Sequence, residues 1–362
     1  MKKGITTLIP ENIAPPDAVA LAIFDGSKKI CDVDISGMRP GNMGELLYRF
    51  GVVADLHVTE KTVGWNPVAK LDNALTHFEN EGCVMCIACG DLTQTGFYRR
   101  TDEGDASTTY LDERQFAQYK AICDGHGIPV HALMGNHESY YGMPIANNLE
   151  LMEAYTGRAA LAYTVEQGED LFILCGQDQA TSVMSDADFA WLGETLAANA
   201  HRRCFVFIHP YMEEDSGDAM DVRENSIFDF WGAAKTNAFK DLLRQYPNVV
   251  LFHGHSHMKF QCQELDLSAN YTEKNGFQSV HVPSLGVPRD VDTVKLVSVD
   301  DHGASQGYVV DVYPDGIHLR GWDFVGATAV PIASYWLDTT LVEIPAGTYR
   351  DSTGTINTEV IG

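Results

Sequence analysis

The most constraining stretch of the sequence is the segment 249–257, which reads VVLFHGHSH. Its first four residues are apolar and two of them are β-branched, which predicts a buried β-strand. Residues two apart in an extended chain point the same way, so His255 and His257 are expected to share one face. Gly254 lets the backbone turn sharply and approach whatever the two imidazoles hold. The segment therefore predicts a buried strand that delivers two potential metal ligands.

The same design recurs earlier along the chain. Four further apolar runs, each followed by polar side chains, occupy residues 50–54, 83–89, 128–134 and 204–208. Helical patterns separate these runs: Asn66 is expected to cap a helix with Pro67 at its first position, and Ser185 with Asp188 forms a capping box. Strands that alternate with helices predict a layered α/β core.

The polar residues at the predicted strand ends are of the types that bind transition metals. They are Asp55, His57, Asp91, Asn136, His137, His209, His255 and His257. In α/β sheets, sites assemble at the carboxyl ends of strands, so these side chains are expected to meet. Mixed nitrogen and oxygen ligands suit Mn, Fe or Zn better than Ca or Mg, which favour all-oxygen shells. The pattern therefore predicts a transition-metal site.

The ordered series Asp-x-His, Gly-Asp, Gly-Asn-His-Glu, His and Gly-His-x-His resembles the calcineurin-like metallophosphoesterases, over residues 51–257. The resemblance implies a four-layer α/β/β/α sandwich that holds two metal ions. It implies that Asp55, His57 and His257 bind the first metal. It also implies that Asn136, His209 and His255 bind the second, and that Asp91 bridges the two.

The same resemblance implies a two-metal phosphoester hydrolase. A hydroxide activated by metals about 3.5–4 Å apart would attack phosphorus in line. His137 would be the general acid, since an imidazole with a pKa near ~6.5 can protonate a leaving group. We expect Glu138 to share the catalytic work with His137 and Asp91, by holding the His137 ring and raising its pKa. Because only Asp55 and Asp91 are anionic, the loaded site is expected to stay cationic and to favour phosphate.

The residues after Asp91 indicate which branch of the family the chain resembles. Phosphoprotein phosphatases of this superfamily continue with Asp-Arg, whereas this chain has Leu92 and Thr93. Purple acid phosphatases place a tyrosine where Gln94 stands, so a tyrosinate-bound iron is not expected. The chain looks most like the bacterial cyclic-nucleotide phosphodiesterase and general phosphoesterase branch. We therefore expect phosphodiesters such as cyclic nucleotides, or small phosphomonoesters, as substrates.

Two other functions stay open at this point. One is a non-catalytic, metal-bound binding or assembly module that uses the terminal extensions, which would also suit a homo-oligomer. The other is a nuclease of the same superfamily. The net charge of −25 disfavours nucleic acid and anionic membranes as partners, because binding to phosphate backbones depends on Lys and Arg.

Three regions are predicted along the chain. Residues 1–49 are expected to form an N-terminal β extension packed on the core, with a strand hairpin turning at 25–27. Residues 50–324 form the phosphoesterase domain, which closes with a hairpin turning at 314–316. Residues 325–362 form a turn-rich tail, so the chain ends in a β-rich extension.

Composition points to a cytoplasmic protein. The eight cysteines are scattered or lie inside apolar strands, as expected of reduced thiols. The apolar run after Lys2 and Lys3 is broken by Pro10, so a signal peptide is not expected. No apolar stretch approaches the roughly 18 residues that a membrane helix needs.

Overall fold

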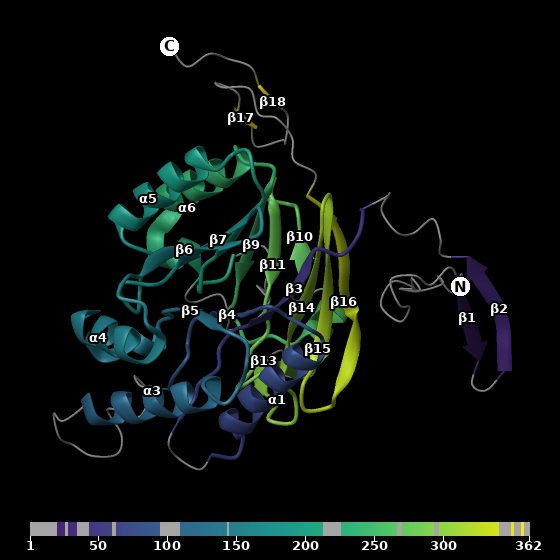
Figure 1. Ribbon diagram of the computed structural model, residues 1–362, viewed down its shortest axis with the longest axis horizontal. Coiled ribbons are helices and arrows are strands. Elements are labelled where there is room, and N and C mark those ends of the chain that lie inside the picture. Colours follow the sequence, from purple (N-terminus) through teal and green to yellow (C-terminus); the bar gives the residue numbers. More distant parts are fainter. Residues whose placement is uncertain are drawn as a thin grey trace.

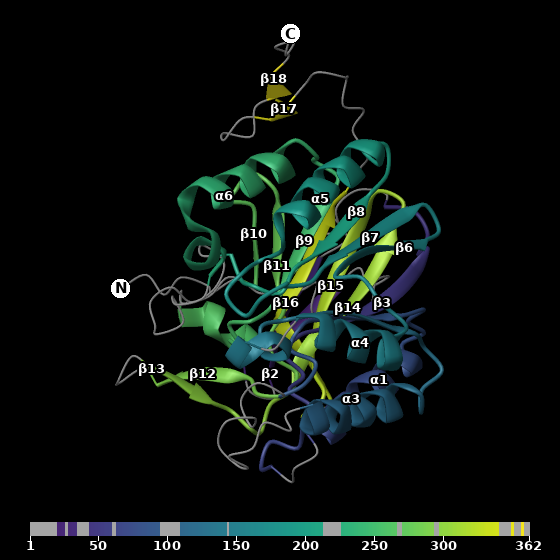
Figure 2. The same cartoon turned by 90° about the vertical axis from the view of Figure 1, so that its left-hand side faces the viewer.

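Two six-stranded β-sheets pack face to face in the computed structural model (Figure 1). The structure describes residues 20–25, 28–34, 43–59, 63–94, 109–142, 145–212, 226–265, 270–292, 297–339, 349–350 and 356–357. Helices cover the outer face of each sheet, which gives four layers (Figure 2). The predicted α/β/β/α sandwich is confirmed.

The first sheet combines parallel and antiparallel strands. Its order is β16 (Thr328–Asp338), β15 (Gly316–Asp323), β14 (Gln306–Tyr313), β3 (Tyr48–Val53), β4 (Cys86–Cys89) and β5 (Val130–Leu133). Strands β3, β4 and β5 run parallel, and β14 joins β3 antiparallel. Tyr313 pairs with Gly316, which confirms the predicted hairpin.

The second sheet carries the other strands that lead to the site. Its order is β10 (Tyr271–Thr272), β11 (Gln278–His281), β9 (Val249–His253), β8 (Cys204–Phe207), β7 (Asp170–Cys175) and β6 (Ala162–Gln167). Strands β7, β8, β9 and β11 are parallel neighbours, so their carboxyl ends lie along one edge. That edge carries the histidines that follow β8 and β9.

The helices lie on the outer faces of the sheets. They are α1 (Pro67–Asn80), α3 (Thr109–Cys123) and α4 (Ile145–Thr156) on the first sheet, and α5 (Asp186–Ala198) and α6 (Ile227–Arg244) on the second. Asn66 caps α1 through its side chain, with Pro67 in the first turn, as predicted. Ser185 accepts a hydrogen bond from the amide of Asp188 at 3.0 Å, which confirms the predicted start of α5.

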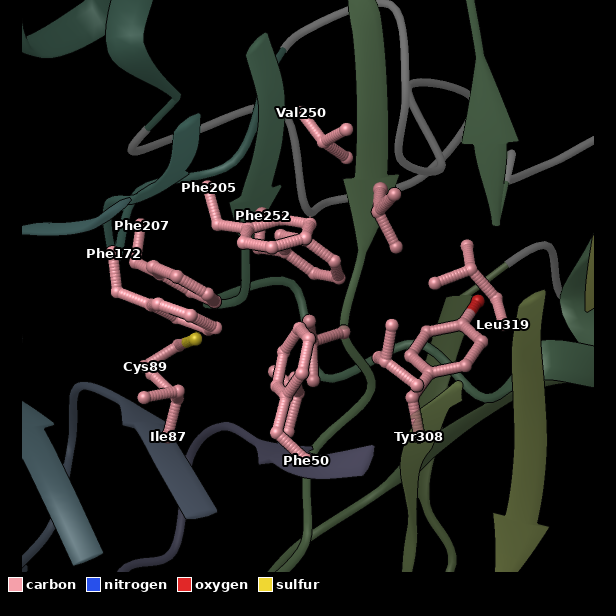
Figure 3. Close-up of a cluster of buried hydrophobic side chains, with 14 of the residues drawn as sticks. Phe50, Ile87, Cys89, Phe172, Phe205, Phe207, Val250, Phe252, Tyr308 and Leu319 are labelled. Carbon is pink, nitrogen blue, oxygen red and sulfur yellow. The ribbon is translucent and has the colours of Figure 1, made fainter. Parts of the chain in front are cut away.

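Aromatic side chains fill the space between the sheets. Figure 3 shows the labelled rings of Phe50, Phe172, Phe205, Phe207, Phe252 and Tyr308 gathered in this layer. Phe50 meets Phe172 edge-on at 4.9 Å, and Phe207 stacks on Phe252 at 5.0 Å. Such rings bury large apolar areas and add directional contacts, so they hold the two sheets in register.

The remaining elements are short. They are β1 (Ala20–Asp25) with β2 (Lys28–Asp34), β12 (Arg289–Asp292) with β13 (Val297–Asp300), β17 (Tyr349–Arg350) with β18 (Ile356–Asn357), and the 3₁₀ helices η2 (His137–Gly142) and η4 (Phe260–Leu265). Asp25 pairs with Lys28, which confirms the strands of the N-terminal hairpin. The packing of residues 1–49 on the core stays a prediction.

One strand lies inside the span predicted as a turn-rich tail. Strand β16 forms an edge of the first sheet, and its pairing with β15 shifts register between Arg320 and Trp322. Pro331 lies within β16 and breaks the strand pattern in the sequence. An edge strand tolerates proline because one row of its amides has no partner strand to bond.

The described part of the chain contains no helix that combines the length and the apolar character required to cross a bilayer.

Candidate metal centre

The seven predicted ligands lie just beyond the carboxyl ends of β3, β4, β5, β8 and β9. The ligand atoms form two groups, and within each group all of the atoms lie within 4.8 Å of one another. The first group comes from Asp55, Asp91, His209 and His255, and the second from Asp55, His57, Asp91 and His257. Asn136 joins the first group, because its Oδ1 lies 2.9 Å from Nε2 of His209. The structure therefore brings together every residue predicted as a ligand.

Both carboxylates lie near the two groups. The resemblance implies that Asp91 bridges the metals and that Asp55 binds the first one, and this assignment stays a prediction. Oδ1 of Asp55 lies 3.1 Å from Nε2 of His257 and 3.8 Å from Nε2 of His209. Oδ2 of Asp91 lies 3.3 Å from Nε2 of His209 and 3.8 Å from Nε2 of His57. Both carboxylates are thus close to ligands of each group.

The backbone is left-handed at most of the ligands. Seven non-glycine residues in the described chain have positive φ, and five of them are Asp55, His57, Asp91, His255 and His257, with φ between 48° and 73°. This region is uncommon for residues with a side chain and costs on the order of 1–3 kcal/mol each. It turns each strand end sharply, so that the side chain faces the centre. Contacts with the surrounding residues must offset this free-energy cost.

Two glycines leave room for the ligands. A Cβ on Gly135 would lie 2.2 Å from Oδ1 of Asp91, and one on Gly90 would lie 2.5 Å from Nδ1 of His209. Gly90 also has φ of 88°, which a residue with a side chain rarely adopts. Glycine at these motif positions therefore lets backbone and ligands pack directly against one another.

Hydrogen bonds fix which nitrogen faces the centre in two of the ligand rings. Nδ1 of His209 donates to the carbonyl of Cys89 at 2.7 Å, and Nδ1 of His257 donates to the carbonyl of Val287 at 2.9 Å. Because a carbonyl only accepts, Nδ1 of each ring carries a proton, and Nε2 is left to face the centre. Metal-binding histidines are oriented in this way.

Each carboxylate has one oxygen anchored and one directed at the centre. Oδ2 of Asp55 accepts from the amide of His255 at 2.9 Å, and Oδ1 of Asp91 accepts from the amide of His137 at 2.9 Å. The other two oxygens, Oδ1 of Asp55 and Oδ2 of Asp91, are buried and accept no well-aligned hydrogen bond. A buried anionic oxygen without a donor is costly unless a cation lies beside it.

The ring nitrogens crowd together in a way that fits metal ions. Nε2 of His57 lies 3.1 Å from Nε2 of His257, and Nδ1 of His255 lies 3.1 Å from Nε2 of His209. A metal binds imidazole nitrogen at about 2.0–2.1 Å, which brings two nitrogens of one shell to such a separation. Together with the orphaned carboxylate oxygens, this arrangement fits a pair of transition metals.

Burial keeps two of these imidazoles, His57 and His255, in their neutral, metal-binding form. Burial lowers the pKa of His57 well below its usual value, and burial with the neighbouring His209 lowers the pKa of His255 to about 3. His209 differs: burial opposes its charged form, but Asp91 and Asp55 raise its pKa to about 9.

His137 lies beside the ligands without joining either group. Its Nε2 is 3.8 Å from Oδ2 of Asp91, and its ring meets the ring of His57 edge-on at 4.5 Å. Burial lowers the pKa of His137, with Asp91 opposing the shift. The direction is the reverse of the one expected from Glu138.

Glu138 bonds to the loops on either side of it. Its Oε1 accepts from the amide and hydroxyl of Thr93 at 3.0 and 3.2 Å, and its Oε2 accepts from the amide of Gly135 at 2.8 Å. Burial and the charge of Asp91 raise the pKa of Glu138 to about 7. The carboxylate thus ties together the loops after β4 and β5, and its catalytic role beside His137 stays a prediction.

A loop at 284–287 supports the centre and was missed by the sequence reasoning. The hydroxyl of Ser284 donates to the carbonyl of Asp55 at 2.8 Å, and the carbonyl of Val287 orients His257. The loop acts largely through backbone groups, which every residue has. No motif in the sequence could have signalled it.

A family model described as calcineurin-like phosphoesterase matches residues 48–259, which is more than half of the 362-residue chain. The chain belongs to the calcineurin-like phosphoesterase family. With its full set of ligands, this family member is a metal-dependent phosphoesterase, and the family implies a binuclear metal centre.

Solved structures share the fold of this calcineurin-like phosphoesterase. A dimetal phosphatase from Danio rerio aligns with a TM-score of 0.55 and 14% identity, covering 82% of this chain and 100% of that one. The purple acid phosphatase PPD1 from yellow lupin aligns with a TM-score of 0.53 and 14% identity, covering 83% of this chain and 55% of that one. At this identity the likeness establishes the fold alone. No curated protein sequence matches the chain.

Proposed function

We propose that this calcineurin-like phosphoesterase hydrolyses small phosphoesters, with His137 as the general acid. The substrates would be phosphodiesters such as cyclic nucleotides, or small phosphomonoesters. The observation that carries the proposal is the position of His137, next to Asp91 but outside both ligand groups. Its side chain stays 14% exposed, whereas those of His57 and His209 are 2% and 0% exposed. An accessible imidazole at the rim of a buried centre suits proton transfer.

The metal pair would be held by the seven ligands described above. When bound, two divalent ions supply positive charge and Lewis acidity to phosphoryl oxygens. We propose Mn, Fe or Zn, because the ligands combine imidazole nitrogens with carboxylate and amide oxygens. The orphaned oxygens of Asp55 and Asp91 support this part of the proposal.

His137 would be held in place by its own backbone. Its amide donates to Oδ1 of Asp91, so the imidazole stays beside the centre while its side chain moves a proton. Burial lowers the pKa of His137, which leaves the ring neutral at rest. A bound phosphoester brings negative charge, which favours the imidazolium and so prepares the ring to protonate the leaving oxygen.

A partly exposed aromatic ring beside the centre favours substrates that carry an organic group. Phe230 lies 6.1 Å from the His255 ring, and the fully buried Tyr211 lies nearly parallel to that ring with centroids 6.0 Å apart. Phe230 is half-buried, at the start of α6. An apolar ring edge next to a cationic centre suits a nucleobase or an aryl group attached to phosphate.

Leaving-group dependence tests the role of His137. The purified protein would be loaded with Mn, Fe, Zn or Co and assayed on bis-p-nitrophenyl phosphate and on a cyclic nucleotide. p-Nitrophenolate leaves without protonation, whereas a ribose alkoxide needs a proton. We therefore expect His137→Gln to lower kcat on the cyclic nucleotide by about 10²–10⁴-fold and to affect the aryl ester much less. Equal losses on both substrates, with unchanged metal content, would remove His137 from the acid role.

The non-catalytic alternative makes the opposite prediction. A metal-bound binding or assembly module would take up metal but hydrolyse neither substrate with any of the four ions. Light scattering of the full chain, with and without residues 325–362, would then show whether the tail builds an oligomer.

We also propose a reducing, cytoplasmic setting. Seven of the eight cysteines have side chains that the structure describes, and these seven are free. Disulfides are rare where glutathione and thioredoxin keep thiols reduced, so free cysteines support this setting.

A further inference from the structure

A buried lysine lies behind the metal centre. Lys70 is on α1 and its side chain is only 3% exposed. Its ammonium nitrogen donates to the carbonyl of Gly286 at 2.7 Å. Burial lowers the pKa of Lys70 to about 8, while Asp301 and Asp323 act in the opposite direction. Lysine is rarely buried to this extent unless its charge has a partner to hold.

The carbonyl that Lys70 holds belongs to the loop 284–287, which joins two ligands of one group. The hydroxyl of Ser284 donates to the carbonyl of Asp55 at 2.8 Å, and the amide of Gly286 donates to the same carbonyl at 3.0 Å. The carbonyl of Val287 accepts from Nδ1 of His257 at 2.9 Å. The loop thus connects the end of β3 to the ligand that follows β9.

The loop is packed tightly against the strand end that carries Asp55 and His57. A Cβ on Gly286 would lie 2.2 Å from the carbonyl oxygen of Leu56, the residue between Asp55 and His57. One side of Gly286 therefore lies against the metal-binding strand end, and its carbonyl accepts from α1. A charged donor makes a stronger hydrogen bond than a neutral one, so the ammonium of Lys70 fixes this carbonyl firmly.

We propose that Lys70 is a positioning residue for the half of the metal centre formed by Asp55, His57 and His257. By holding Gly286, it fixes the loop that orients the His257 ring and the Asp55 backbone. Lys70 does not touch metal or substrate in this proposal. The inference rests on the metal centre of the proposed function but not on the substrate or on the role of His137.

Metal binding measured without substrate tests the proposal. Apo protein would be titrated with Co²⁺, by calorimetry for the two dissociation constants and by visible absorption for the ligand field. We expect Lys70→Met to weaken one dissociation constant by about 10–100-fold, the usual cost of losing a group that orients a metal ligand, and to change the other little. Lys235→Met is the matched control, since Lys235 is exposed on α6 and pairs with Asp186. It should leave both constants unchanged.

Double variants identify the affected half. His257→Gln should already remove the site that Lys70 supports, so adding Lys70→Met should change Co²⁺ binding no further. In a His209→Gln background, Lys70→Met should still weaken the remaining site. Equal weakening of both sites, or none, would overturn the proposal.

A second single variant guards against a failure to fold. Ser284→Ala removes one of the two hydrogen bonds that the loop makes to the Asp55 carbonyl, without touching the buried charge. We expect the same site-selective loss of Co²⁺ affinity, of smaller size. Lys70→Arg keeps a charged donor and should recover part of the affinity lost in Lys70→Met. Failure of both expectations in folded protein would contradict the role of the loop. Because no turnover is measured, an inactive enzyme would not affect the outcome.

Discussion

The amide of His255 donates a 2.9 Å hydrogen bond to Oδ2 of Asp55, which lies 200 positions earlier in the chain. Asp55 follows β3 of the first sheet and His255 follows β9 of the second. The bond therefore joins ligands from the two sheets, independently of any metal. The centre is assembled by the fold, and metal binds to a prepared arrangement of side chains.

Removing metal should lower stability without unfolding the protein. Because the ligands are already positioned, far-UV circular dichroism is expected to stay the same after chelation. Bound metal at about 100 times its Kd stabilises the fold by about 2.7 kcal/mol, so Tm should fall by several degrees. Calorimetry with EDTA and with added Mn²⁺ measures the shift. A loss of secondary structure on chelation would mean that metal assembles the centre.

Asp91→Asn should prevent the binding of the two metal ions but should not prevent folding. Asparagine keeps the oxygen that accepts from the amide of His137, but it removes the charge of the buried, orphaned Oδ2. We expect metal affinity to fall by more than about 100-fold and hydrolysis to fall with it. The apo variant should be less stable than the apo wild type: burial opposes the charge of Asp91, but His209 and His137 lower the pKa of Asp91 well below its usual value, so this charge stabilises the fold. Inductively coupled plasma analysis and thermal melts check both points. Asp241→Asn, at an exposed site on α6, is the control.

Gly135→Ala should damage the centre by steric conflict alone. The new methyl group would lie 2.2 Å from Oδ1 of Asp91 and 2.5 Å from the Asp91 amide nitrogen. Overpacking of this kind costs typically about 1–3 kcal/mol, and displacing Asp91 should also reduce metal content. Urea denaturation and metal analysis measure the two effects. Gly64→Ala is the matched control, because a Cβ there would meet nothing within 4 Å. If Gly135→Ala left both the stability in urea and the metal content unchanged, the loop after β5 would be free to move.

Asp311 should make stability depend on pH in the acid range. Its side chain is fully buried and bonds Arg49 at 2.7 Å and Arg320 at 3.0 Å. Burial opposes the charged form, but His318 and Arg320 lower the pKa of Asp311 from 3.8 to about 2. A depressed pKa stabilises the fold above the unfolded value, so about 2 kcal/mol should be lost as pH falls from about 4 through about 2.

Denaturation in urea from pH 7 to pH 2 checks this expectation. Asp311→Asn should be destabilised at neutral pH, because it leaves two arginines without their buried partner. The difference between wild type and variant should shrink as the pH falls below about 4. Parallel curves across the whole range would show that another carboxylate controls acid unfolding.

Much of the centre was predictable because its ligands follow apolar strands in motifs of a few residues. His255 and His257 illustrate this: a buried strand, a glycine and two histidines are local in sequence and fall together in space. The cap of α1 at Asn66 and Pro67 was equally local. Such features need no knowledge of distant contacts.

Other features depend on partners far along the chain. The carboxylate of Glu138 bonds to Thr93 and to the amide of Gly135, and its place in the sequence next to His137 does not indicate the bond to Thr93. The loop 284–287 contributes carbonyls and amides, which leave no trace in residue type. Strand β16 was hidden by Pro331, which an edge strand accepts and an inner strand does not.

The left-handed backbone at Asp55, His57, Asp91, His255 and His257 has a consequence for descent. Glycine would adopt these backbone angles more easily. Each position therefore carries a metal-binding side chain at the cost of a less favourable backbone conformation. Metal binding favours the side chain at each of these positions. A descendant that gave up hydrolysis while keeping the fold should therefore drift toward glycine or asparagine at these five positions before its core changes. The residues found at these five positions would then indicate when hydrolysis was lost.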